Sequence, residues 1–174
     1  YSIFIAGGVG NGEASDDDRI LELLESQLQQ ASKESTLLLP GDYLSEEEGQ
    51  WDRDKKLIDT QLGLRRSFKG EIIFLPGNNE WKRRSLESLE KTEQYLKDKE
   101  IQAAAVLPEN GCPLEHLVIN DRLDMILIDS RWFTSNWSRV KGINKKCTDI
   151  ITRRRFAEEL EGYINDGQGK NIVI

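Results

Sequence analysis

The sequence has little histidine, little cysteine, few basic residues and no long apolar run. One His among 174 residues excludes any site of this chain alone that needs two imidazoles. No apolar run approaches the roughly 20 residues that cross a bilayer, so no membrane-spanning helix is expected. Basic residues are outnumbered by acidic ones, 24 to 31, which gives a net charge of −7. Because nucleic-acid-binding domains usually present a basic surface, this balance argues against nucleic acid as the partner.

The chain ends also lack the features of a complete secreted precursor. No signal peptide precedes the first apolar run, and the chain starts at Tyr1 and stops at Ile174 inside runs that are typical of strands. We therefore expect a trimmed segment of a longer protein. Apolar residues make up 37% of the chain and charged residues 32%. The length fits one domain over residues 1–174, or a large piece of one.

Short apolar runs alternate with helical patterns along the chain. The first three strands are expected to be parallel because helices connect them, and their apolar character fits burial on both faces. The pattern therefore predicts an α/β fold. Strands are expected at 3–6, 36–39 and 71–75, an antiparallel hairpin at 114–119 and 123–128, and a last strand from 171. Four helices are expected: one over 15–32, one that ends near residue 67, one that ends near residue 99, and one over 148–166. A loop is expected at 108–113.

Glycine-bearing loops follow the first three predicted strands, at Gly7-Gly8, Gly41-Asp42 and Gly77-Asn78. In open α/β sheets, ligands bind beyond the carboxyl ends of the strands. Asp42 and Asn78 are therefore expected near each other, and both offer the hard oxygen donors that divalent metals prefer. The alternative is that both residues serve only the turns in which they stand.

Two of these loops resemble motifs of the calcineurin-like metallophosphoesterases. The family pattern is a strand followed by D-x-H, a strand followed by G-D, and a strand followed by G-N-H-[DE]. Residues 37–42 (LLLPGD) are similar to the second motif and residues 74–81 (FLPGNNEW) to the third. Residues 128–133 resemble a bacterial branch in which two cysteines flank a similar loop. The resemblance implies a layered α/β/β/α sandwich, of which this chain covers the N-terminal two thirds.

The chain departs from the family pattern at its metal ligands. Gly8 and Gly10 stand where the first motif has Asp and His, and Asn79 stands where the third motif has its catalytic His. An amide cannot donate a proton to a leaving alkoxide as an imidazolium does, so Asn79 is expected to be non-functional in catalysis. Asp42, the metal-bridging carboxylate by resemblance, and Asn78, a ligand to one metal, match directly.

The remaining residues of the matching motifs are candidate ligand-binding positions. These are Gly41, Gly77 and Glu80, the last of which, by resemblance, mostly orients its neighbours. A two-metal phosphoesterase holds two dications roughly 3.5–4 Å apart, and several anionic ligands must offset their repulsion. One carboxylate and one neutral amide are too few. We therefore expect no resident cofactor, only weak or vestigial metal binding and little or no hydrolysis.

Three functional hypotheses follow from these residues. The first is a non-catalytic domain that binds a phosphate-bearing small molecule or a protein partner at the sheet edge. The second is an active phosphatase with a Mn, Fe or Zn centre whose missing ligands come from Asp16, Asp17, Asp129 or the absent C-terminal part. The third is a purely structural interaction module that uses the aromatic stretch at 132–137, whose rings line a partner surface or else fold onto the core.

Cys112 and Cys147 stand in loop-like segments without C-x-x-C spacing or a companion His, so a zinc site is not expected. They form a disulfide or are two unrelated thiols. A bridge would close roughly 36 residues and contribute about 4 kcal/mol in the chain-entropy model. The resemblance to the bacterial branch favours the disulfide, and with it an extracytoplasmic location. His116, in the hairpin, is expected to have a structural or surface role.

Overall fold

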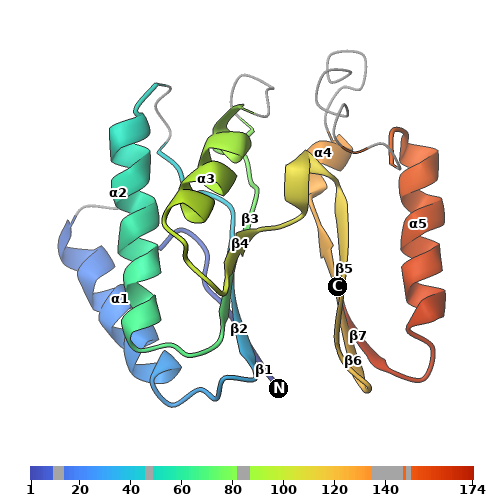
Figure 1. Cartoon of the computed structure of the whole chain (residues 1–174), viewed down its shortest axis with the longest axis horizontal. Helices are drawn as coiled ribbons and strands as arrows, with labels where there is room; N and C mark the ends of the chain where they lie inside the picture. Colours follow the sequence, from blue (N-terminus) through green and yellow to red (C-terminus); the bar gives the residue numbers. More distant parts are fainter. Residues whose placement is uncertain (10–13, 46–48, 82–86, 135–146, 148–149) are drawn as a thin grey trace.

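The computed structural model describes residues 1–9, 14–45, 49–81, 87–134, 147 and 150–174, with only the backbone for 14–18. Strands and helices alternate up to residue 106, and an antiparallel pair of strands follows (Figure 1). The elements are β1 (Ser2–Ile5), α1 (Ala14–Leu28), β2 (Ser35–Pro40), α2 (Trp51–Leu62), η1 (Gly63–Arg66), β3 (Glu71–Leu75), α3 (Glu87–Asp98), β4 (Ala104–Val106), η3 (Glu109–Gly111), β5 (Leu114–Asn120), β6 (Leu123–Ile128), α4 (Ser130–Thr134), α5 (Arg153–Asp166) and β7 (Asn171–Val173).

The first sheet has the strand order β1-β2-β3-β4, and all its neighbours run parallel. This confirms the parallel arrangement predicted for the first three strands. Within β2, every residue from Ser35 to Leu39 is buried, as expected for a strand covered on both faces. The second sheet has the order β5-β6-β7, in which β5 and β6 form the predicted antiparallel hairpin and β6 runs parallel to β7.

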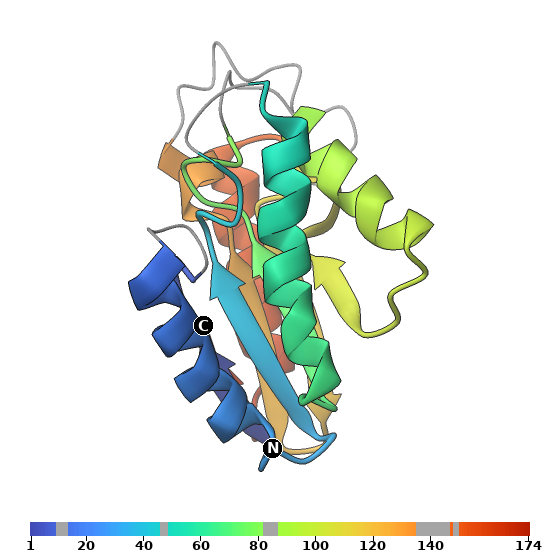
Figure 2. The same ribbon diagram turned by 90° about the vertical axis from the view of Figure 1, so that its left-hand side faces the viewer.

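Side-chain alternation along the strands builds separate apolar layers. Leu37 and Leu39 pack with the helices that cover one face of the first sheet, while Leu38 packs with Met125 and Leu127 of the second sheet. The outer face of the second sheet packs against α5, for example through Phe156. The molecule is therefore a mixed α/β structure with helices outside two facing sheets (Figure 1). Figure 2 shows α1, α2 and α3 side by side over the first sheet.

Several element bounds differ from the predictions. The strand β4 was not predicted, because two alanines and a valine have little strand character of their own; pairing with β3 creates it. The first helix begins at Ala14 and ends at Leu28, so it ends four residues earlier than the expected 15–32. The last helix begins only at Arg153, where Thr152 caps it by accepting a hydrogen bond from the Arg155 N–H. Two short helical turns also form, η3 within the segment 108–113 that was expected to be a loop, and α4 directly after β6.

No helix in the described ranges combines the length and apolar composition that crossing a bilayer requires.

Candidate functional site

The loops after β2 and β3 touch each other at the carboxyl edge of the first sheet. The Gly41 N–H donates to the Leu75 carbonyl at 2.8 Å. A Cβ on Gly77 would meet the Gly41 Cα at 2.7 Å, closer than real side chains allow. Gly41 also has a φ of +70°, which favours glycine. The two motif loops are therefore pressed together backbone against backbone, as only glycines permit.

The Glu80 side chain hydrogen-bonds to both loops from their buried side. Its buried carboxylate accepts hydrogen bonds from the N–H groups of Gly77 at 2.8 Å, Asp42 at 3.0 Å and Leu44 at 2.9 Å. Burial raises the pKa of Glu80, and these main-chain donors oppose that rise. The carboxylate is thus occupied by the loops themselves and orients them rather than facing a ligand.

Asp42 and Asn78, which stand in these two loops, are both exposed. Asn79 is half-buried, and its Nδ2 donates to the Leu44 carbonyl at 3.2 Å, so its amide also serves the loop structure. Gly8, after β1, has a φ of +64° with open space where a Cβ would stand. Gly10 lies outside the described residues. Of the predicted ligands, the structure therefore brings the loops of Asp42 and Asn78 to one edge.

This donor set does not fit a two-metal centre. Among the residues that the structure describes at this edge, the exposed donors are one anionic side chain, Asp42, and one neutral amide, Asn78, since the Glu80 carboxylate is turned inward. Within the part of the chain that the structure describes, no group of three or more His, Cys, Asp or Glu side chains stands close enough to hold a metal ion. Two dications need more negative charge than one carboxylate supplies.

Asp129, an alternative ligand of the second hypothesis, is buried in a different arrangement. Its Oδ2 accepts from the Trp81 Nε1–H at 2.6 Å, and its Oδ1 accepts from the Trp132 N–H at 2.9 Å. Burial raises the pKa of Asp129 to about 6, against the effect of these donors. The carboxylate therefore ties the third motif to the start of α4. The side chains of Asp16 and Asp17 lie outside the described residues.

Tyr43 is a further polar residue beside the motif that the sequence did not single out. Its ring packs edge-on against Phe74 with a centroid distance of 5.2 Å. Its hydroxyl is buried and has no hydrogen-bond partner within the described part of the structure. Burial, and then the charges of Glu80 and Asp129, raise the pKa of Tyr43 well above its ordinary value. No signal in the sequence marks it, because aromatic residues after a turn are common in cores.

Cys112 and Cys147 form a disulfide with a Cα–Cα distance of 5.3 Å, which confirms the predicted pairing.

His116 hydrogen-bonds the Asp124 carboxylate through Nε2 at 3.1 Å and stacks on Tyr163. In the aromatic stretch, Trp132 is buried in the core.

Phe133 is 38% exposed, with the Arg153 guanidinium over its ring, and Trp137 lies outside the described residues.

No family model, no curated protein and no solved structure matches this chain.

Proposed function

We propose that this chain is a domain of the calcineurin-like metallophosphoesterase type whose metal site is degenerate and which binds a ligand or protein partner without hydrolysing it. The observation that carries the proposal is the contact between the Gly41-Asp42 loop and the loop from Gly77 to Glu80. The G-D and G-N-x-[DE] patterns thereby share one edge of a parallel sheet, where α/β folds place their ligands. The facing sheets, covered by helices on both outer sides, are consistent with the α/β/β/α sandwich of that family.

The donors at this edge support the loss of catalysis. Gly8 has no ligating side chain, Asn79 carries no transferable proton, and Asp42 is a single negative charge. Two dications held by so few anions would repel each other strongly. The domain keeps the backbone of the edge, fixed by Glu80, while the described side chains of the edge carry less negative charge than a hydrolytic centre requires.

The proposal includes an extracytoplasmic location. The Cys112–Cys147 disulfide supports it, because disulfides persist mainly in oxidising compartments.

The test compares the native chain with a variant that carries Gly8→Asp, Gly10→His and Asn79→His. Mn²⁺ uptake is measured by calorimetry and turnover with p-nitrophenyl phosphate. We expect neither specific uptake nor turnover in the native chain, and Mn²⁺ uptake in the triple variant. Adding Asp42→Ala to the triple variant is the matched control and is expected to abolish that uptake. Native turnover that Asp42→Ala removes would instead establish an active phosphatase and refute the proposal.

A further inference from the structure

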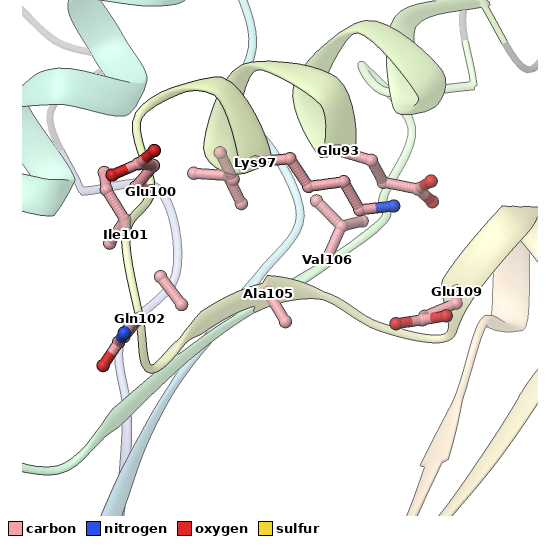
Figure 3. A pocket seen from close by; sticks show the side chains of 10 residues that line it. Glu93, Lys97, Glu100, Ile101, Gln102, Ala105, Val106 and Glu109 are labelled. Atoms are coloured by element: carbon pink, nitrogen blue, oxygen red, sulfur yellow. The ribbon is translucent and has the colours of Figure 1, made fainter.

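The disulfide stands at the wall of a cavity. The groove in Figure 3 lies between α3 and β4, and Glu109 is at one end of it. Glu109 also lines a second cavity, of about 730 Å³, between η3 and β5 on one side and α5 on the other. Cys112 and Cys147 both line this second cavity. A small molecule that enters it therefore reaches the disulfide, and this inference does not rest on the proposed function.

The two cysteines of the disulfide have different surroundings. Cys112 is partly exposed. Cys147 is 5% exposed and belongs to the buried apolar cluster that also contains Trp81 and Trp132. In thiol–disulfide exchange a thiolate attacks one sulfur of the bridge, and the other sulfur leaves. The difference in exposure makes Cys112 the sulfur that an incoming thiolate attacks and Cys147 the sulfur that leaves.

Charged side chains of the cavity determine which kind of thiol can approach the bridge. Among the described residues that line it, Glu109, Glu115 and Glu159 are acidic and Arg155 is basic. Arg155 is already paired with Glu159. Glu109 and Glu115 therefore leave the lining with a net negative charge, which attracts a cationic thiol and repels an anionic one.

Trp81 connects the buried side of the bridge with the third motif. Its main-chain N–H donates to the Gly77 carbonyl at 3.3 Å, within the loop that the Glu80 carboxylate holds. Its indole N–H donates to Asp129 at 2.6 Å. The Trp81 ring and Cys147 share one apolar cluster. A change in packing at Cys147 therefore alters the surroundings of a ring that belongs to the motif loop.

We propose that the Cys112–Cys147 disulfide is a redox switch for the loop from Gly77 to Trp81, opened by a small cationic aminothiol that enters this cavity. Cleavage removes the covalent link between η3 and the apolar cluster, so the cluster repacks around Cys147 and the Trp81 ring changes its surroundings. In an oxidising compartment the bridged form is the resting form, and the aminothiol opens it.

The exchange takes two steps and two aminothiol molecules. The first thiolate bonds to the Cys112 sulfur, the bond between the two cysteine sulfurs breaks, and Cys147 leaves with the electron pair as a thiolate. The second thiolate attacks the aminothiol sulfur of this mixed disulfide and releases Cys112 as a thiolate. Two aminothiols are thereby oxidised to one disulfide, the bridge gains two electrons, and the protons that the aminothiols give up end on the cysteine sulfurs.

The first test measures how fast small thiols reduce the bridge in the whole chain. Cysteamine is the cationic thiol, mercaptoethanol the neutral one and mercaptopropionate the anionic one. Each rate is divided by the rate of the same thiol with hydroxyethyl disulfide, which corrects for its nucleophilicity. We expect the corrected rate of cysteamine to exceed that of mercaptopropionate about tenfold or more. Peptide mapping should find the trapped mixed disulfide on Cys112.

The contribution of the lining is tested with Glu109→Gln combined with Glu115→Gln, which removes two charges and keeps the side-chain size. The preference for cysteamine over mercaptopropionate should fall about fivefold. The matched control, Glu34→Gln with Glu71→Gln, makes the same charge change at exposed positions outside the cavity and should keep the preference within about twofold. If the cavity variant does not fold, added salt should lower the preference of the native chain in its place.

The second test follows the indole N–H signals by NMR while cysteamine reduces the bridge. The signals of Trp81 and Trp132 should shift and should return when the bridge is oxidised again. Trp51 is the internal control, because it packs against Tyr95 at the first apolar cluster, and its signal should stay in place. A chain with Cys112→Ser and Cys147→Ser should show the reduced positions, and if it does not fold the reduced native chain decides.

Four outcomes would overturn the proposal. Equal corrected rates for cysteamine and mercaptopropionate would mean that the cavity does not select the thiol. A mixed disulfide on Cys147 would mean that the buried sulfur is the one attacked. An unchanged Trp81 signal in the reduced chain would mean that the bridge does not act on the motif loop. Unfolding of the whole chain on reduction would mean that the bridge only stabilises the fold.

Discussion

Two buried carboxylates stand at opposite ends of β6, and their surroundings differ. Asp129 follows the end of the strand and accepts from neutral donors, the Trp81 indole and the Trp132 main chain. Asp124 stands near the start and accepts from the Lys170 ammonium at 2.9 Å and from His116. Each is 1% exposed. Burial raises the pKa of Asp129 to about 6, whereas the hydrogen bond from Lys170, followed by His116, lowers the pKa of Asp124.

The comparison shows what decides the ionisation of a buried carboxylate in this molecule. Neutral donors reduce the cost of burying a charge without cancelling it, so burial dominates at Asp129. A cation in contact reverses the balance at Asp124. Glu80 belongs with Asp129, since its donors are main-chain N–H groups and burial raises its pKa. The end of the molecule with the motif loops therefore contains carboxylates whose ionisation opposes folding, and the other end contains one whose ionisation supports it.

The largest effect is expected from Glu80→Ala. The change leaves three main-chain N–H groups, those of Gly77, Asp42 and Leu44, without their acceptor. Each orphaned buried donor costs about 1–3 kcal/mol, so the free energy of unfolding should fall by about 4 kcal/mol after partial hydration. Urea unfolding at pH 7 measures the loss.

Glu22→Ala on the exposed face of α1 is the control for Glu80→Ala and should change the free energy of unfolding by no more than about 0.5 kcal/mol. Equal effects of the two substitutions would show that the Glu80 carboxylate does not hold the loops together.

The next effect is the pH dependence that Asp129 contributes. Its pKa rises on folding from the ordinary 3.8 to about 6, so the folded state binds the proton more tightly. The contribution is therefore present below pH 4 and is lost as the pH rises to about 6, by up to about 3 kcal/mol. Urea unfolding across this range should show the native chain losing stability relative to Asp129→Asn. A difference that stays flat between pH 4 and 6 would refute the assignment.

The smallest effect is expected at Asp124, with the opposite sign. Its pKa lies below the ordinary 3.8 in the folded state, so its contribution is full above that value and is lost as the pH falls through the lowered pKa. The stability gap between the native chain and Asp124→Asn should therefore close in acid. The same titration of the two variants at Asp124 and Asp129 measures both slopes, and slopes of one sign would contradict the comparison.

The sequence predicted the elements with strong apolar patterns. β3 matches its predicted bounds of 71–75, and the hairpin of β5 and β6 lies within one residue of expectation, because branched and aromatic residues mark these strands. β4 was not predicted, because it forms by pairing with β3 and the local sequence of β4 has no pattern typical of a strand. The predicted helix over 148–166 includes Thr152, whereas in the structure Thr152 caps α5 and the helix begins at Arg153.

For the site, the sequence placed Asp42 and Asn78 at the same sheet edge, since parallel strands end on one side. The sequence could not show which groups hydrogen-bond to the carboxylates of the three acids Glu80, Asp124 and Asp129. Their partners lie 3 to 48 residues away along the chain, and their pairing depends on tertiary packing. The Asp129–Trp81 contact in particular joins two loops that no sequence pattern connects.

Because the glycines at positions 41 and 77 are in close backbone contact, the shape of this edge does not depend on the chemical groups that it exposes. The loops are held by a carboxylate beneath them and by backbone contact between them, and neither requires any particular group on the outward side. Exposed positions such as 78 can therefore change identity at little cost in folding. A scaffold of this kind can exchange one set of surface groups for another while its backbone shape stays the same. The shape of the edge can therefore persist when the chemistry of its exposed groups changes.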